Sequence, residues 1–150
     1  MRIVIINGPN LNLLGRREPD IYGNVSFEAY LETLKNAFPQ VGFDYFQSNH
    51  EGALIDRIQA DGFDPDTAIV LNAAGYTHTS VALADAVRAV PATVAEVHLS
   101  DISRREPYRA HSFLAEVCPI RFIGFGLDSY RMAVEALLAE TEALPAEKEQ

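Results

Sequence analysis

Tyr22 and the two arginines before it are the first residues whose types and spacing suit catalysis. They lie in the polar segment NGPNLNLLGRREPDIYG (7–23). A free tyrosine has a pKa of about 10 and is a poor base at neutral pH. A guanidinium about 4 Å away, at an effective dielectric constant near 20, lowers a phenol pKa by roughly three units. Arg16 or Arg17 would therefore make Tyr22 a base; alternatively, Tyr22 packs on a sheet edge and the arginines are solvated.

Glu96 and His98 form a second combination, which suits acid catalysis. They are two residues apart in EVHLS (96–100), so a strand would place both on one face. A carboxylate beside an imidazole fixes its tautomer and raises its pKa, which keeps the ring protonated for donation. His98 is therefore the general-acid candidate; a histidine satisfied by backbone at a strand end is the alternative.

The segment NAAGYTHTS (72–80) offers groups that could bind a hydroxylated ligand. Asn72 follows an apolar run and His78 adds a donor. Thr79 or Ser80 would begin a helix whose free amides favour an anion. An ordinary helix cap with a surface histidine is the competing interpretation.

Arginine placement limits the ligands that this chain could attract. The net charge is −9, of which residues 139–150 contribute −3, so the body carries −6. Such a field repels nucleic acid and anionic lipid. An anionic small molecule could bind only at the two arginine clusters, 16–17 and 104–109. Arg105 and Arg109 would share a helical face that closes on a carboxylate, although an exposed charged turn has the same spacing.

Several chemistries lack their residues. The two lysines, Lys35 and Lys148, lie away from the polar segments, which argues against a Schiff base. The four histidines include no close pair and Cys118 is the single cysteine, so we expect no metal site. The usual glycine-rich nucleotide motifs are absent, and we expect no cofactor. One cysteine and no long apolar stretch predict a soluble cytoplasmic protein without membrane contact.

Alternating strands and helices would position these residues. Helical spacing of apolar residues separates the strands, and Ser26 and Asp128 are candidate N-caps. The pattern predicts an α/β fold, a flavodoxin-like, doubly wound five-stranded parallel sheet in one domain (1–150), with an acidic tail at about 140–150 that is a candidate for disorder. The five predicted strands are 2–6, 41–46, 68–72, 93–99 and 120–125.

The polar segments follow the first, third and fourth of these strands. Since ligands of open α/β sheets bind beyond the carboxyl ends of the strands, all the candidate chemistry falls on one edge. A non-enzymatic module of this fold, such as a receiver or flavin carrier, is an alternative. A receiver needs acidic residues where this chain has Asn7 and Asn72.

Six segments together resemble type II 3-dehydroquinate dehydratase of the shikimate pathway, over Arg2 to about Leu138. They occur in order as NGPNLNLLGRREPDIYG (7–23), QSNHEGALID (47–56), LNAAGYTHTS (71–80), EVHLS (96–100), REPYRAHS (105–112) and GFGLDSY (124–130). The resemblance implies a homododecamer (a tetramer of trimers) that uses no cofactor. It implies trans-elimination of water from 3-dehydroquinate to give 3-dehydroshikimate.

The resemblance also implies residue roles. Tyr22 would take the proton next to the ketone, with Arg17 lowering its pKa. Asn10 would help hold a water that stabilises the enolate, while Glu96 orients His98, which protonates the departing hydroxyl. Asp85 would reach a neighbouring subunit's site and Arg105 would belong to a mobile lid. The implied substrate-binding residues are Asn72, His78, Leu99, Ser100 and Arg109.

The chain departs from many relatives at Asp101, Ser103 and Arg104. An aspartate near a carboxylate-binding site would weaken binding unless Arg104 offsets it. An enzyme of the same fold that acts on another polyhydroxylated carboxylate is a further alternative.

Overall fold

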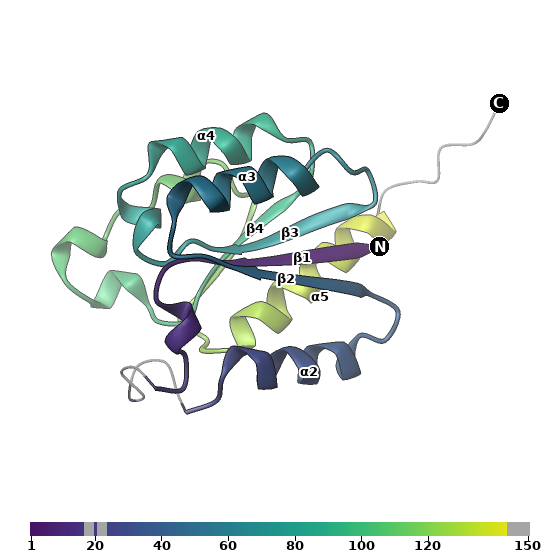
Figure 1. The fold of residues 1–150 in the computed structure, drawn as a ribbon, viewed down its shortest axis with the longest axis horizontal. Helices are drawn as coiled ribbons and strands as arrows, with labels where there is room; N and C mark the ends of the chain where they lie inside the picture. The colour runs from purple at the N-terminus through teal and green to yellow at the C-terminus, as the bar shows by residue number, and fades with distance from the viewer. Residues whose placement is uncertain (17–19, 21–23, 144–150) are drawn as a thin grey trace.

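A five-stranded parallel sheet forms the middle layer of the computed structural model, which describes residues 1–16, 20 and 24–143 (Figure 1). The strand order is β2-β1-β3-β4-β5, the flavodoxin-like order predicted above. The strands are β1 Arg2–Asn7, β2 Gly42–Gln47, β3 Thr67–Asn72, β4 Val94–His98 and β5 Ile120–Ile123. Each predicted strand is confirmed to within two residues at either end.

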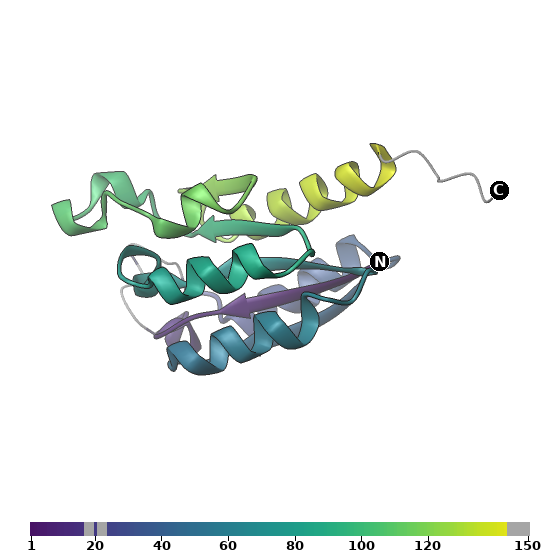
Figure 2. The ribbon, with the colours of Figure 1, turned by 90° about the horizontal axis from the view of Figure 1, so that it is seen from above.

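Among the described residues, two α-helices cover each face of the sheet. In Figure 1, α3 (Glu51–Asp61) and α4 (Val81–Ala89) lie above the sheet, while α2 (Phe27–Ala37) and α5 (Asp128–Ala143) lie below it. Viewed from above, α3 and α4 lie in front of the strands and α2 lies behind them (Figure 2). Two separate apolar clusters fill the spaces between sheet and helices. Because the central strands are buried on both faces, their sequences are continuous apolar runs rather than alternating ones.

The helix starts mostly follow the predicted caps. The Ser26 hydroxyl accepts from the Ala29 amide at the start of α2, and Ser80 accepts from the Leu83 amide at the start of α4. Asp128 is not an N-cap, because α5 begins at that residue; its carboxylate lies in the first turn, where it also suits the helix dipole. Residues 140–143, which the predicted tail included, are helical, and residues 144–150 lie outside the described residues.

The connections beyond the carboxyl ends of the strands are built from short 3-10 helices. They are η1 Leu11–Leu13 after β1, η2 Ala74–His78 after β3, and η3 Ile102–Arg104, η4 Pro107–Arg109 and η5 Phe113–Glu116 after β4. Gly8 lets the first two connections approach, because a Cβ there would lie 2.6 Å from the Ala73 carbonyl oxygen. Among the described residues, no helix is long and apolar enough to cross a membrane.

Candidate active site

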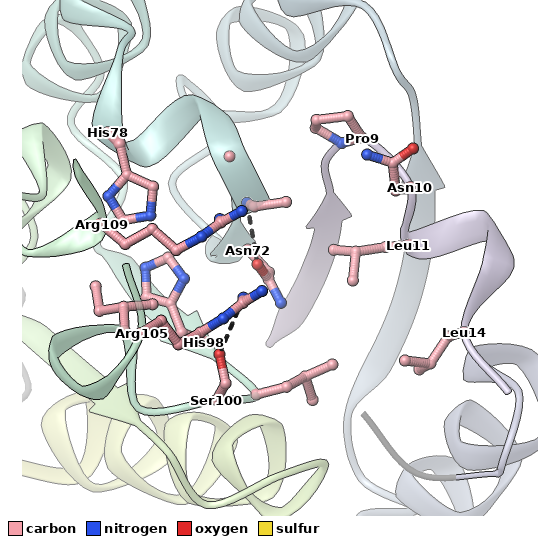
Figure 3. A pocket seen from close by; sticks show the side chains of 14 residues that line it. Pro9, Asn10, Leu11, Leu14, Asn72, His78, His98, Ser100, Arg105 and Arg109 are labelled. Carbon is pink, nitrogen blue, oxygen red and sulfur yellow. Dashed lines mark hydrogen bonds between the residues drawn. The ribbon is translucent and has the colours of Figure 1, made fainter. Parts of the chain in front are cut away.

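A cavity opens at the carboxyl edge of the sheet, where the connections after β1, β3 and β4 meet (Figure 3). The segment Pro9–Leu14 forms one side, and two histidines and two arginines face it from the other. Eight of the predicted site residues line this cavity. They are Asn10, Asn72, His78, His98, Leu99, Ser100, Arg105 and Arg109.

Glu96 lies behind His98 and is fully buried. Its Oε1 lies 2.7 Å from His98 Nε2 and accepts from the hydroxyls of Thr77 (3.1 Å) and Ser112 (2.5 Å). Its Oε2 accepts from Arg121 Nε at 2.5 Å. Burial raises the pKa of Glu96, but the bond and charge of His98, then Arg121 and Ser112, outweigh it and lower the pKa to about 2. Glu96 is therefore a carboxylate at neutral pH.

The ionised state of Glu96 defines the tautomer of His98. A carboxylate only accepts hydrogen bonds, so Nε2 of His98 must carry a hydrogen. The other ring nitrogen, Nδ1, has no hydrogen-bond partner among the described residues and can serve a ligand, since the ring lines the cavity. A protonated ring with one nitrogen held and the other free has the arrangement of a general acid.

His78 is held by its Nδ1, whereas His98 is held by its Nε2. Nδ1 of His78 lies 2.7 Å from the carbonyl oxygen of His111, which can only accept, so Nδ1 donates. Burial lowers the pKa of His78. The hydrogen bond to His111 raises it, but the nearby charges of His98 and Arg109 lower it further, and the net shift is downward. His78 is thus neutral at pH 7, and its Nε2 can accept from a ligand hydroxyl.

Asn72 belongs to a buried chain of hydrogen bonds that the sequence did not predict. Its Nδ2 donates to the Tyr130 hydroxyl (2.8 Å), which donates to Asn7 Oδ1 (2.7 Å), while Asn72 Oδ1 accepts from the Ala74 amide (3.1 Å). Asn7 and Asn72 are partners at the ends of β1 and β3, and Tyr130 is fully buried on α5. The Asn72 amide therefore enters the site with its orientation set.

Arg105 and Arg109 both point into the cavity (Figure 3). The prediction of a shared helical face is wrong, because Arg105 caps η3 and Arg109 ends the separate helix η4. The Glu106 carboxylate, which was not predicted, lies 2.8 Å from Arg109 Nε and 3.9 Å from Arg105 Nε. Its own backbone amide and Arg109 lower its pKa, so it is charged. Two cations and one competing anion thus stand at the mouth of the site.

The segment that follows β1 is braced by Gln47, the last residue of β2, and by Asn49 just beyond that strand. Gln47 Nε2 donates to the Gly8 carbonyl (3.1 Å), and the Asn10 amide donates to Asn49 Oδ1 (2.9 Å). Asn10 has the left-handed value φ = 70°, which asparagine tolerates better than most residues. Its side chain can therefore face the cavity while its backbone is held from below.

The remaining predicted residues lie elsewhere. Asp85 is exposed on α4, where it forms an ion pair with Arg88, and it does not line this cavity. Asp101 also stays out of the cavity lining; it caps η3 by accepting from the Ser103 amide and hydroxyl. Its negative charge therefore serves local structure. Tyr22 and Arg17, the predicted base and its partner, lie outside the described residues.

Sequence reasoning missed Thr77, Ser112 and Arg121, all of which contact Glu96. A signal was present for Arg121, because a lone arginine in an apolar strand such as IRFI requires a partner. No group of three or more potential metal ligands occurs among the residues that the structure describes.

Comparison with known proteins places this arrangement in a family. The family model for class II dehydroquinases matches residues 1–138. A 3-dehydroquinate dehydratase from a species of Exiguobacterium is 51% identical over 139 residues, which are 92% of this chain and 94% of the relative. One from Chlorobaculum tepidum is 44% identical over 137 residues, 91% of this chain and 93% of the relative.

A solved structure agrees with both. The type II dehydroquinase of Butyrivibrio crossotus superposes with a TM-score of 0.88 at 41% identity, covering 92% of this chain and 97% of the other. Because the family model covers nearly the whole chain and the relatives are similar along almost their full lengths, the chain belongs to the class II dehydroquinase family.

Proposed function

We propose that this protein removes water from 3-dehydroquinate to give 3-dehydroshikimate, by trans-elimination through an enolate in the shikimate pathway of aromatic amino acid biosynthesis. The observation that carries the proposal is the His98–Glu96 couple, which faces one cavity together with Arg105 and Arg109. A reaction that expels hydroxide needs a proton donor, and a carboxylate substrate needs cations. This cavity holds both.

His98 supplies the proton in this mechanism. Glu96 holds Nε2, so Nδ1 delivers its proton to the departing hydroxyl, which leaves as water. Glu96 stabilises the imidazolium before transfer, and its hydrogen bonds prevent the ring from turning. The acid is therefore presented in one orientation.

Tyr22 takes the proton from the carbon next to the ketone, and Arg17 favours the phenolate. Their loop leaves β1 at the same edge of the sheet, and its earlier part, Pro9–Leu14, lines the cavity opposite His98. That arrangement favours removal of a proton and loss of hydroxide from opposite faces of the ring. Asn10 helps to hold a water against the enolate oxygen.

The other cavity residues bind the substrate. Arg109 binds a hydroxyl or the carboxylate, with Arg105 closing over the site as part of a lid. Neutral His78 accepts from a hydroxyl, and Asn72 donates the amide hydrogen that Tyr130 does not use. The backbone of Leu99 and the Ser100 hydroxyl complete the set. No cofactor is needed, because both proton transfers use side chains.

Asp85 acts across a subunit boundary in this proposal. Its exposure on α4, away from the cavity of its own chain, suits a residue that reaches a neighbouring site. A homododecamer built as a tetramer of trimers, located in the cytoplasm, would supply such a neighbour. Mass measurement in solution tests the assembly.

The test of function is turnover without additions. The purified protein should convert 3-dehydroquinate to a product with the ultraviolet absorbance of a conjugated enone, with no added metal or nucleotide. Tyr22→Phe and His98→Ala should each lower kcat by at least about 100-fold, the usual contribution of a general acid or base. Near-normal turnover of either variant would remove that residue from the mechanism, and a wild type that leaves the substrate intact would refute the proposal.

A further inference from the structure

We infer that Arg121 is a positioning residue for the acid half of the reaction: acting through Glu96, it holds His98 in place and makes its proton easier to release. This inference rests on the proposed role of His98 as the general acid. Arg121 does not line the cavity, so any effect on turnover must pass through Glu96.

The sheet itself brings Arg121 to Glu96. The two residues are direct partners in the parallel pairing of β4 with β5. The Arg121 side chain is about one-third exposed, whereas that of Glu96 is fully enclosed. Strand register, rather than a flexible surface contact, therefore delivers a cation to a buried carboxylate.

The two oxygens of Glu96 serve different partners. Oε1 receives His98, Thr77 and Ser112, whereas the hydrogen bond to Oε2 found among the described residues comes from Arg121. With Oε2 bound, the carboxylate cannot rotate to offer its other oxygen to His98. Removing Arg121 would leave a buried oxygen unpaired and free the carboxylate to turn.

Arg121 also sets how strongly Glu96 retains the proton of His98. While His98 is protonated, Glu96 has two cations beside it. After His98 has given its proton to the departing hydroxyl, Arg121 is the cation that still contacts Glu96. It therefore stabilises the state after proton transfer, and it draws negative charge away from the imidazolium beforehand. Both effects make His98 a stronger acid.

The other groups around Glu96 and His98 keep their charge when Arg121 is changed. Burial raises the pKa of Cys118 to about 12, and burial lowers that of His78, so both are neutral at pH 7. Thr77 and Ser112 carry no charge. The arginines that share the cavity, Arg105 and Arg109, are left unchanged in these variants.

The test is a pH profile of kcat for Arg121→Gln, with Arg121→Lys and Arg131→Gln alongside. A general acid loses activity as pH rises through its pKa. Because the Glu96 carboxylate stands between the Arg121 cation and the ring, and solvent screens part of the charge, loss of Arg121 should move the basic limb of kcat upward by roughly one pH unit. We expect kcat at neutral pH to fall roughly 10-fold, which is the lower end of the losses seen when a residue that orients a functional side chain is removed. KM should stay within about twofold of the wild-type value.

The companion variants separate charge from structure. Arg121→Lys should restore the position of the basic limb, because it retains the charge. Arg131→Gln removes an arginine with two ion pairs on the exposed side of α5 and should leave the profile unchanged. Should Arg121→Gln fail to fold, Arg121→Met keeps the apolar stem and carries the same expectation.

A double variant tests whether Arg121 works through Glu96. Adding Arg121→Gln to Glu96→Gln should change kcat by less than about twofold, because the carboxylate that couples Arg121 to His98 is already gone. Independent, multiplying losses would overturn the inference, as would an unmoved basic limb in Arg121→Gln. Turnover by the wild type in the same assays separates this outcome from failure of the proposed function.

Discussion

Replacing Tyr130 by phenylalanine removes a single hydroxyl that joins the two strand-end asparagines. That hydroxyl accepts from Asn72 Nδ2 at 2.8 Å and donates to Asn7 Oδ1 at 2.7 Å. The phenylalanine ring fills the same space, so the change isolates the two hydrogen bonds. Asn7 has little other polar support, since its Nδ2 is already buried without a hydrogen-bond partner among the described residues.

The expected loss of stability follows from those two orphaned groups. A buried polar atom that loses its partner costs about 1–3 kcal/mol. Asn7 is fully enclosed and belongs at the upper end of that range, whereas Asn72 lines the cavity, where water can replace the hydroxyl. We therefore expect Tyr130→Phe to lower the free energy of unfolding by about 2–4 kcal/mol, a large share of the 5–15 kcal/mol typical of domains.

Urea unfolding at one fixed protein concentration measures this loss, and steady-state assays measure the accompanying change at Asn72. KM should rise several-fold, because the amide that binds substrate is no longer held. Tyr30→Phe is the matched control: the Tyr30 hydroxyl is buried, without a partner among the described residues, and its ring lies 6.2 Å from that of Tyr130. Its removal should change stability by less than about 0.5 kcal/mol. Equal stabilities of the two variants would refute the reasoning.

Two further predictions concern charge. The pKa of Glu96 is lowered from 4.5 to about 2, so its ionisation stabilises the fold above pH 4.5, and this contribution is lost as pH falls toward 2. As pH falls through that range, the free energy of unfolding should therefore decline less in Glu96→Gln than in the wild type, by on the order of 3 kcal/mol. Parallel curves for the two proteins would contradict this prediction. Glu106→Gln should lower KM for 3-dehydroquinate by about 2–5-fold, the range of an exposed ion pair, because a competing anion leaves Arg105 and Arg109. Glu135→Gln removes one of the two ion pairs of Arg131, which does not line the cavity, and is the control. A KM that rises in Glu106→Gln would count against competition.

The fold could be predicted because its signals are local. The apolar runs 2–6 and 68–72 are too short for helices and are buried on both faces, which predicts central parallel strands. Ser26 and Ser80 stand directly before helical spacing and act as the caps expected of them. The prediction that Asp128 is an N-cap was wrong by one residue, which is the usual uncertainty of a helix end.

The gathering of site residues could also be predicted, since parallel strands end at one edge. The individual contacts between side chains at that edge could not be predicted from the sequence. Asn7 and Tyr130 are 123 positions apart, and Glu96 and Arg121 are 25 apart, so their contacts depend on register and helix rotation. Arg105 and Arg109 illustrate the opposite error: a spacing of four suggested one helix, but Pro107 starts a new turn between them.

The two halves of the proposed reaction are supported in different ways, and the reaction explains why. His98 lies at the end of a central strand, and its partner Glu96 is fixed by three further side chains from three other parts of the chain. A rigid acid is suitable because proton transfer to the leaving oxygen requires one orientation of donor and acceptor. The loop after β1 instead contains Asn10 and Gly15 with positive φ, and side chains after β2 brace it. In the proposed mechanism such a loop would admit the substrate and then close, which would keep water from the enolate. Stiffening it should therefore slow substrate entry or product release before it affects the acid.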